Sequence, residues 1–250
     1  MPEMVKNIKA VRVGKETAEI DERISNDEEI KIIVNKTVIG NFSMSPTYLK
    51  EFVIGYLLGE GLITSADDII DINIEGRTVN VSTDLADFDL RRELVMSSDC
   101  FGGMRGKVEL TKKVESDLKV TKEEIFKASK KLKEDSKIWS ETGGTHIAAL
   151  IKNGDIITIE DVSRHVAIDK VIGVAALKKI DFSNSFIFSS GRMPGDMIIK
   201  VARVGIPLIA SKSAPTSSGY MVGQEANVTI IGFVRGGRFN IYTHPERISN

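Results

Sequence analysis

The 250-residue sequence has one cysteine, almost no net charge and no long apolar run. A lone cysteine cannot form an internal disulfide, which is typical of a protein of the reducing cytoplasm. The 34 basic and 35 acidic residues give a formal net charge of −1, so no overall field attracts nucleic acid or a membrane surface. The longest apolar runs, residues 52–58 and 171–177, are far shorter than the roughly 20 residues of a membrane-spanning helix. Residues 1–19 hold no apolar core of a signal peptide. We therefore expect a cytoplasmic protein with neither a nucleic-acid nor a membrane partner.

Sequence motifs of several enzyme classes are also absent. Neither a Walker A sequence nor a dinucleotide fingerprint occurs. A zinc nucleobase deaminase needs H-x-E and P-C-x-x-C, but His146 is followed by Ile147 and Ala148, and there is no C-x-x-C pair. The three histidines and one cysteine match no zinc spacing, so we expect no bound metal. A hydrolase that pairs Cys100 with His146 or His165 stays open, because spatial adjacency cannot be read from the sequence.

A hydrophobic content of 42% is enough to bury a substantial core, and the first half of the chain predicts strands and a helix. Apolar residues nearly alternate in residues 29–42 around Asn35-Lys36, which predicts a β-hairpin. Ser45-Pro46 predicts the N-terminus of a helix, and Gly59 predicts its end. Two strand-like segments follow, at residues 70–74 and 77–82.

These elements predict an N-terminal α+β subdomain of residues 1–110, which ends in the loop around Cys100. Residues 121–124 have the spacing of a capping box, and apolar residues follow at helical spacing. The helix is rich in lysine, so one face is expected to be solvated. We therefore expect residues 111–137 to contain a connecting helix on the surface.

From residue 138 onward, short apolar strands alternate with helices, which predicts a layered α/β domain of residues 138–250. Pro194 and Gly205 flank the best-defined of these helices, since proline favours a helix start and glycine favours a helix end. The expected strands are residues 146–151, 155–159, 186–189, 207–210 and 228–231, and the expected helices are residues 166–179, 195–204 and 217–226.

Polar, glycine-rich segments follow the expected strands. In an open α/β sheet, loops at the carboxyl ends of the strands converge on a crevice where ligands bind. Arginine beside glycine suits phosphate, because the guanidinium binds two oxygens while backbone N–H groups approach closely. We therefore expect a ligand that carries several phosphates. The segments are residues 141–146, 160–165, 189–192, 211–216 and 233–238.

Three of these segments, residues 141–146, 160–165 and 233–238, also have a purely structural explanation. Residues 235–238, Arg-Gly-Gly-Arg, are by themselves typical of a hairpin turn with solvated charges. His146 beside an apolar strand is more often a structural histidine than a catalyst. His165 fits a cap or a packing residue of the helix that follows it. Glu160 and Asp161 are explained most simply as acids near the N-terminus of the same helix, where the helix dipole favours them.

Cys100 lies in a glycine-rich loop rather than in an apolar run, where a cysteine that packs as a small hydrophobe is usually found. An exposed thiol on a loop suggests a use for its nucleophilicity. Arg105 and Lys107 would favour the thiolate, whereas Asp99 would oppose it. The alternative is an incidental loop cysteine.

Taken together and in order, these segments resemble the FdhD (also called NarQ) family of formate dehydrogenase accessory sulfurtransferases. Residues 160–170, EDVSRHVAIDK, resemble its EDVGRHNAVDK signature, with Ser163 at the position of the glycine. Residues 142–149 match its TGGxHxAA block. Further likeness occurs at residues 46, 58–61, 190–192, 213–216 and 232–242, so the resemblance covers about residues 30–248.

The resemblance implies a sulfurtransferase that accepts persulfide sulfur from a cysteine desulfurase. It would pass this sulfur to the molybdenum or tungsten bis-guanine-dinucleotide pterin cofactor, bound transiently, before insertion into the catalytic subunit of formate dehydrogenase. The implied fold is a cytidine-deaminase-like three-layer α/β/α domain without zinc, plus a smaller N-terminal subdomain, in a homodimer. The family's catalytic cysteine falls on Cys100. Its cofactor-binding segment falls on Phe233, Val234, Arg235, Gly236, Gly237 and Arg238.

The chain departs from the family pattern in the cysteine loop. The family often carries C-G-x-C-G there, whereas Phe101 stands at the first glycine and Gly103 at the second cysteine. A second loop thiol cannot relay sulfur in this chain, so the sequence is compatible only with a single-thiol carrier. A chaperone that binds the cofactor without moving sulfur is the alternative function.

Overall fold

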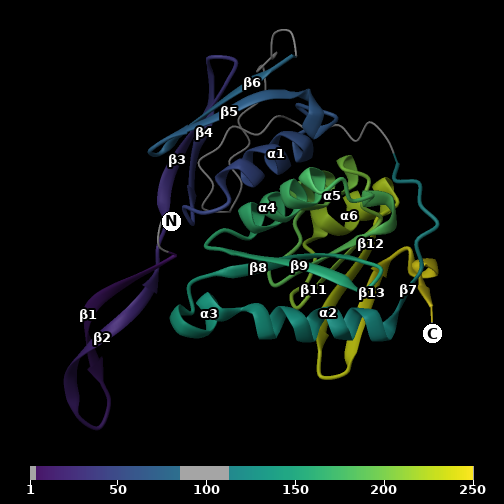
Figure 1. Cartoon of the computed structure of the whole chain (residues 1–250). Coiled ribbons are helices and arrows are strands. Elements are labelled where there is room, and N and C mark those ends of the chain that lie inside the picture. The colour runs from purple at the N-terminus through teal and green to yellow at the C-terminus, as the bar shows by residue number, and fades with distance from the viewer. Residues whose placement is uncertain (1–3, 85–112, 250) are drawn as a thin grey trace.

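The computed structural model describes residues 4–84 and 113–249, which form a mixed α/β structure (Figure 1). Its largest sheet has six strands in the order β13-β12-β11-β10-β8-β9. Strands β10, β11 and β12 run parallel, while β8, β9 and β13 pair antiparallel with their neighbours. The carboxyl ends of the parallel strands therefore lie along one edge of the sheet. The strands are β8 (His146–Lys152), β9 (Asp155–Asp161), β10 (Phe186–Ser189), β11 (Leu208–Ser211), β12 (Thr229–Arg235) and β13 (Arg238–Thr243).

Helices cover both faces of this sheet and make three layers (Figure 1). Successive residues of a strand point to opposite faces, so Ala148 and Leu150 of β8 pack in one apolar cluster while Ile147 and Ala149 pack in another. Burial of both faces explains why the central strands β8, β10 and β11 are almost continuously apolar. Helices α4 (Arg164–Leu177), α5 (Gly195–Arg203) and α6 (Ser217–Ala226) lie on one face, and α2 (Lys122–Asp135) lies on the other.

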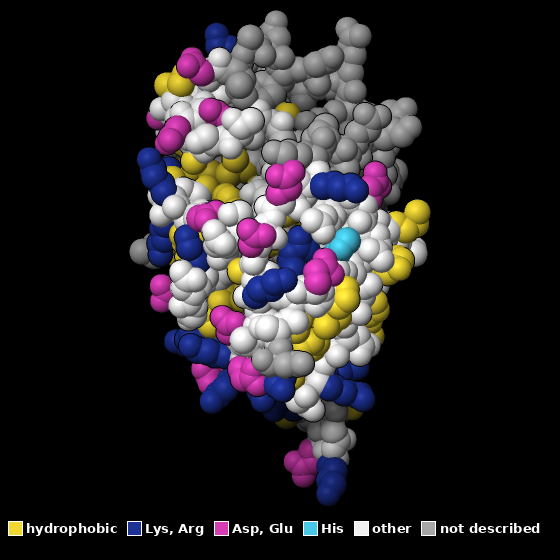
Figure 2. Space-filling view, turned by 90° about the vertical axis from the view of Figure 1, so that its right-hand side faces the viewer, with side chains coloured by type: hydrophobic (Ala, Val, Ile, Leu, Met, Phe, Trp, Pro, Cys, Tyr) yellow, Lys and Arg dark blue, Asp and Glu magenta, His cyan; other side chains and the backbone are white. Residues whose placement is uncertain are grey.

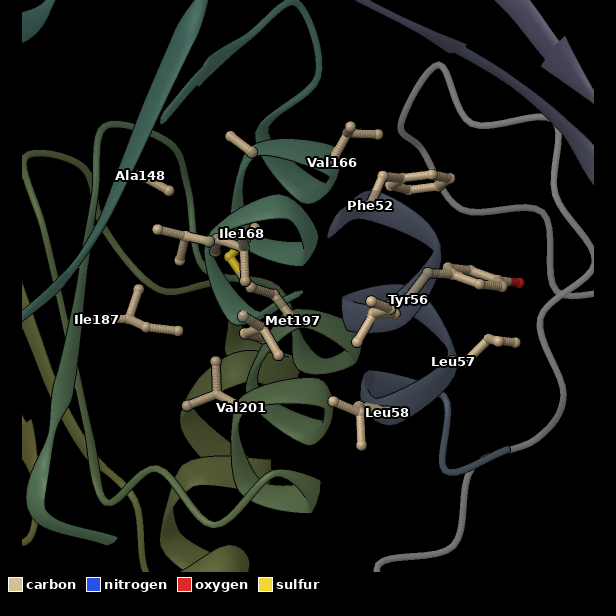
Figure 3. Close-up of a cluster of buried hydrophobic side chains, with 14 of the residues drawn as sticks. Phe52, Tyr56, Leu57, Leu58, Ala148, Val166, Ile168, Ile187, Met197 and Val201 are labelled. Carbon is tan, nitrogen blue, oxygen red and sulfur yellow. The ribbon is translucent and has the colours of Figure 1, made fainter. Parts of the chain in front are cut away.

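The first half of the chain contributes a four-stranded sheet and helix α1 (Leu49–Gly59), which lies against α4. A Cβ atom at Gly55 would lie 1.8 Å from the carbonyl oxygen of Asp169, and one at Gly173 would lie 1.8 Å from that of Glu51. The absence of both side chains therefore lets the two helices touch. One apolar cluster extends from this sheet through α1 to α4 and α5 (Figure 3). The sheet order is β4-β3-β6-β5, with β3 (Glu28–Val34), β4 (Thr37–Met44), β5 (Ile69–Glu75) and β6 (Thr78–Thr83).

Strands β1 (Val5–Val13) and β2 (Thr17–Ser25) form a separate two-stranded sheet that extends away from the rest of the molecule (Figure 1). We refer to residues 5–25 as the arm. Strand β7 (Val120–Thr121) pairs with β14 (Ile248–Ser249), which brings the C-terminal segment to the start of α2. The remaining helices are α3 (Lys137–Thr142) and the 3₁₀ turns η1 (Ala66–Asp68), η2 (Phe182–Asn184) and η3 (Pro245–Arg247).

The expectations about surface charge and membrane-spanning segments can be compared with the structure. Acidic and basic side chains are intermixed on the face shown in Figure 2, in keeping with the near-zero net charge. Over residues 4–84 and 113–249, no helix combines the length and apolarity needed to cross a bilayer.

Most of the expected elements are confirmed. The β3–β4 hairpin turns at Asn35 and Lys36, which both have positive φ as a tight two-residue hairpin turn requires. Thr121 and Glu124 form the capping box at the start of α2. Strand β10 and helix α6 have the expected bounds. Local patterns were therefore sufficient wherever a cap, a turn or an apolar run marks the element.

The expected helix start at Ser45-Pro46 is wrong, because α1 begins at Leu49 with Tyr48 as its N-cap. Ser45 is bound by the second half of the chain instead. Its backbone N–H donates to Asp161 Oδ2 at 3.2 Å, and its Oγ accepts the N–H of Val162 at 3.3 Å. Strands β1, β2 and β13 were not expected from the sequence. They are largely exposed, so they lack the clear alternation of apolar and polar residues that marks a half-buried strand.

Candidate functional site

The polar segments that follow the strands meet at one edge of the six-stranded sheet, as expected. Ser190 N–H donates to the Ile147 carbonyl at 3.0 Å, and Lys212 N–H donates to the Ser189 carbonyl at 3.2 Å. Phe233 N–H donates to the Ser213 carbonyl at 2.9 Å. Segments separated by tens of residues in the chain are thus hydrogen-bonded neighbours, because parallel strands end at the same edge.

Buried serines hold the loops at this edge. Ser189 Oγ accepts the N–H of Gly191 at 3.1 Å, and Ser211 Oγ donates to the Gly191 carbonyl at 2.6 Å. Ser211 Oγ also accepts the N–H of Ser213 at 3.0 Å. Both hydroxyls are buried and hydrogen-bonded to the backbone. Their role is to fix the loop conformation, which leaves ligand contacts to other groups.

His146 and Ser190 form a dyad at the start of β8. His146 Nδ1 lies 3.2 Å from Ser190 Oγ, and this Oγ accepts the N–H of Ile147 at 3.1 Å. Burial lowers the pKa of His146, so the neutral imidazole is favoured near pH 7. A neutral imidazole has one ring nitrogen that donates a hydrogen bond and one that accepts, so His146 can either donate to or accept from the Ser190 hydroxyl.

Two pairs of neighbouring basic residues, which we together call the cationic edge, are Arg164 with Arg192 and Lys212 with Lys133. Burial lowers the pKa of Arg164, and the neighbouring charge of Arg192 lowers it further. Burial likewise lowers the pKa of Lys212, with an added contribution from Lys133 on α2. The repulsion between neighbouring positive charges is relieved by a bound anion. The cationic edge therefore has the electrostatics of a phosphate site.

Only part of the cationic edge was predictable from the sequence. Arg164, Arg192 and Lys212 all lie in segments that were expected to suit a phosphate ligand. Lys133 lies on the expected connecting helix, among many solvated lysines. No local pattern distinguishes it, because its proximity to Lys212 is produced by packing of α2 on the sheet.

The expected cofactor segment, residues 233–238, spans the turn between β12 and β13. Gly236 and Gly237 have positive φ and Arg235 pairs with Arg238, so the hairpin-turn interpretation is confirmed. Val234 is buried in the apolar cluster beneath α2, so its side chain faces the core. The guanidinium carbon of Arg235 lies 5.3 Å from the ring centre of Phe233. Arg235, Gly236, Gly237 and Arg238 are exposed, and cofactor binding there stays a prediction.

Cys100 lies outside the described residues, as do its neighbours in the loop. The proposed pairing of Cys100 with His146 or His165 therefore stays untested. Over residues 4–84 and 113–249, no three His, Cys, Asp or Glu side chains come together as a metal site would require.

The EDVSRHVAIDK signature contributes buried ion pairs. Lys170 Nζ contacts Asp161 Oδ2 and donates to the Ser45 carbonyl at 2.8 Å, with both charged side chains fully buried. Lys200 Nζ contacts both oxygens of Asp169, at 2.6 and 2.7 Å. These two pairs join α4 to α5 and to the segment before α1, and we call them the ion-pair lock. Asp161, Asp169 and Lys170 of the signature thus have a structural role.

Other signature residues are also explained by packing. Asp161 Oδ1 accepts the N–H of Ser163 at 2.8 Å near the start of α4, as expected. Glu160 instead accepts the N–H groups of Ile138 and Trp139, at 2.9 and 2.8 Å, so it caps α3 and the expectation for it is wrong. His165 is buried, with its Nε2 3.4 Å from Asp196 Oδ2 of α5, which confirms the packing interpretation.

Comparisons with known proteins agree with the sequence blocks. The model of the FdhD/NarQ family matches residues 25–249. The chain is 50% identical over 245 residues to the sulfur carrier protein FdhD of Methanothermobacter thermautotrophicus, covering 98% of this chain and 99% of that protein. It is 35% identical over 252 residues to the sulfur carrier protein FdhD of Sulfurisphaera tokodaii, covering 98% and 99%.

A solved structure shows the same fold. The crystal structure of a candidate formate dehydrogenase accessory protein from Desulfotalea psychrophila superimposes with a TM-score of 0.83 at 28% identity, covering 99% of this chain and all of that one. Family match, sequence identity and fold thus agree over nearly the whole length. The chain belongs to the FdhD/NarQ family.

Proposed function

We propose that this protein is a sulfur carrier of the formate dehydrogenase system and that Cys100 carries the sulfur as a persulfide. The observation that carries the proposal is the end-to-end similarity to proteins named sulfur carrier protein FdhD, at up to 50% identity. Cys100 is the only sulfur nucleophile of this type in the chain. The Sγ atom of Cys100 is therefore the single candidate for carrying sulfur in this chain.

The first step is thiol–persulfide exchange. The Cys100 thiolate attacks the terminal sulfur of a persulfide on a cysteine desulfurase, and the S–S bond to the desulfurase cysteine breaks. That cysteine leaves as a thiolate, and a new S–S bond forms on Cys100. One S–S bond replaces another, so the step needs neither an oxidant nor a reductant.

The second step delivers sulfur to the bis-guanine-dinucleotide pterin cofactor, which is the cargo. The terminal sulfur leaves Cys100 as sulfide, which requires two electrons. A molybdenum or tungsten centre in the +4 state supplies them and is oxidised to +6, while Cys100 returns to the thiolate. Transfer takes place before the cofactor enters the catalytic subunit of formate dehydrogenase.

The cationic edge and residues 233–238 would hold the phosphates of this cargo. Arg192 is exposed and Arg164 and Lys212 are half-buried, so they can bind anionic oxygens without large rearrangement. Arg235 and Arg238 extend the positive charge along the same edge, beyond β12. The neutral His146 can donate a hydrogen bond to a phosphate or take up the persulfide proton.

The proposed domain architecture also follows from the likeness to this family. We infer that residues 138–250 form a cytidine-deaminase-like domain without zinc, preceded by a subdomain of residues 1–110 and a connecting segment of residues 111–137. The three layers around the six-stranded sheet support the first assignment. We also propose a homodimer as the functional form.

Intact mass measurement tests the sulfur-carrier proposal. The purified protein is incubated with a cysteine desulfurase and cysteine and then analysed without reductant. We expect one added sulfur atom on the wild type and none on Cys100→Ser. Equal addition to both proteins, or no addition to either, would overturn the proposal.

A cofactor-binding chaperone is the second candidate, favoured by the single cysteine and by Gly103 in the cysteine loop. Complementation of a deletion strain separates the two functions. If Cys100→Ser restores full formate dehydrogenase activity, the chaperone is correct. If it restores none while the variant protein accumulates to the wild-type level, the sulfur carrier is correct.

A further inference from the structure

The arm of residues 5–25 is the part of the described chain with the least tertiary support. Strands β1 and β2 pair with each other over nine residue pairs and with no other strand of the described structure. Its base is fixed by a 2.7 Å hydrogen bond between Ser25 Oγ and Thr142 Oγ1 and by an ion pair between Arg23 and Glu141. An isolated two-stranded sheet is marginally stable in water, so further contacts are expected to support it.

The arm has one distinctly apolar face. Residues directly opposite in an antiparallel pair point to the same side, so the pair Ala10 and Ile20 shares a face with the neighbouring pairs. We define the apolar face of the arm as Ile8, Ala10, Ala18, Ile20 and Ile24, which include all of its isoleucines. The charged residues Lys6, Arg12 and Glu22 lie on the same side. Ile8 and Ile24 are each 39% exposed. The base contacts of Arg23 and Ser25 are made from the opposite face, so α3 does not cover the apolar one.

Charge is divided between the two strands of the arm. Strand β1 carries Lys6, Lys9 and Arg12 and no acid. Strand β2 carries three acids, Glu19, Asp21 and Glu22, and one base, Arg23. The arm is therefore a ribbon with a basic strand and an acidic strand.

The separation of basic residues on β1 from acidic residues on β2 favours one of the ways in which two arms can associate. Twofold pairing edge to edge would place β1 beside β1, or β2 beside β2, and so bring like charges together. Face-to-face packing with the two arms antiparallel would also lay β1 over β1. Face-to-face packing with the arms pointing the same way lays the basic strand of each copy over the acidic strand of the other.

We infer that the apolar face of the arm is a self-association surface, on which the arm of a second copy of this chain packs face to face and in the same direction. Ala10 of one copy then lies over Ile20 of the other, and Lys6 lies near Glu22 of the other. The inference gives a contact surface to the homodimer proposed above but does not depend on sulfur transfer. The family match begins at residue 25, the last residue of the arm, so the rest of the arm precedes the part of the chain that the match covers.

Site-directed cross-linking tests the packing without disturbing the buried residues. Ala18 and Glu19 are adjacent on β2 and lie on opposite faces, so they form a matched pair. Each is changed to cysteine, Ala18→Cys or Glu19→Cys, in a Cys100→Ser chain, and treated with a short bis-maleimide, because packed sheets lie about 10 Å apart. We expect covalent dimers from Ala18→Cys and few from Glu19→Cys. Equal yields would contradict the inference.

The direction of the arms is tested by mixing two variants. In the proposed packing, the tip of one arm is far from the base of the other, so Ala18→Cys and Ile24→Cys chains should give no more mixed product than unrelated positions. Preferred cross-linking between these two positions would instead show antiparallel arms and overturn the inference.

Light scattering after size exclusion measures the effect on association. Ile20→Lys should weaken the dimer at least about tenfold, because burial of an isoleucine contributes more than the roughly 1.4 kcal/mol that corresponds to tenfold. Val11→Lys is the control, since Val11 is 61% exposed but lies on the other face. Circular dichroism confirms that both variants fold. A monomeric wild type, or an Ile20→Lys dimer as stable as that of Val11→Lys, would overturn the inference. Intact mass after sulfur loading is recorded on the same variants, so failure of the dimer is distinguishable from failure of sulfur transfer.

Discussion

Basic side chains occupy two contrasting environments in this protein. In the ion-pair lock, Lys170 and Lys200 are buried and each contacts a buried carboxylate, Asp161 or Asp169. At the cationic edge, the charges that perturb Arg164 and Lys212 come from other basic residues. The first environment joins helices together, whereas the second is the one that we propose binds an anion. Residues of one sequence block can therefore serve different purposes, since Arg164 and Lys170 lie on the same helix.

The largest expected effect comes from breaking the lock at Lys170. Lys170→Met leaves Asp161 buried without its cation, which should lower the free energy of unfolding by about 3–5 kcal/mol. Urea unfolding followed by circular dichroism measures the change. Lys179→Met is the control. Lys179 is exposed, and its Nζ makes only a long contact of 3.9 Å with the exposed carboxylate of Asp67. A loss for Lys170→Met no larger than for Lys179→Met would show that the lock contributes no stability.

The next effect concerns the helix contact beside the lock. Gly173→Ala places a Cβ atom against the Glu51 carbonyl and should separate α1 from α4, at a cost of about 1–3 kcal/mol. Gly76→Ala serves as a control for backbone strain, since Gly76 has a positive φ but no atom within 4 Å of its Cβ position. Thermal and urea unfolding of both variants check the order. A more stable Gly173→Ala protein would contradict the close helix contact.

A cation removed from the cationic edge should affect binding rather than folding. Arg192→Gln should lower the affinity for guanosine diphosphate, the nucleotide fragment of the proposed cargo, by roughly tenfold, because a charge-assisted hydrogen bond contributes about 1.5–3 kcal/mol. Its free energy of unfolding should change by less than about 0.5 kcal/mol. Isothermal titration calorimetry measures the affinity. Lys36→Gln, in the exposed turn of the other sheet, should bind as the wild type does, and an equal loss in both variants would argue against the site.

The smallest effect is the pH dependence that His146 gives to stability. Burial lowers its pKa in the folded state, so the unfolded chain binds the proton more readily. The contribution of His146 to the free energy of unfolding is therefore fully present above the pKa of the unfolded chain, about 6.5. It declines as the pH falls toward the pKa of the folded state, by at most about 1.4 kcal/mol per pH unit. His146→Gln should remove that decline between pH 7.5 and 5.5. Urea unfolding across this range checks it, and identical pH slopes in both proteins would contradict it.

Much of the fold followed from local sequence. The capping box at Thr121, the turn at Asn35-Lys36 and the alternation of strands and helices after residue 138 predicted elements that the structure contains. The expected convergence of polar segments also followed, since it needs only parallel strands. The arm and β13 did not follow, because exposed strands bury few side chains and so lack a marked apolar pattern.

The candidate site was less predictable than the fold. The segments that contain Arg192 and Lys212 were correctly placed at one edge, yet the contribution of Lys133 depends on how α2 packs. The Asp161 and Lys170 pair lies within one signature, but its third member, Ser45, is 125 residues from Lys170. Ser45 was taken for a helix cap, because its hydroxyl and the following proline resemble one and its real partners are remote.

By itself, the sequence determined the family, the order of most elements and Cys100 as the single thiol available for sulfur chemistry. These follow from residue identity, capping and periodicity, all of which act over a few residues. Only the tertiary structure decided which charges of the signature are buried in ion pairs with each other or with Lys200. It also decided that Gly55 and Gly173 allow helix contact and that the arm has an uncovered apolar face. Burial and pairing depend on distances between remote segments, which exist only once the chain has folded.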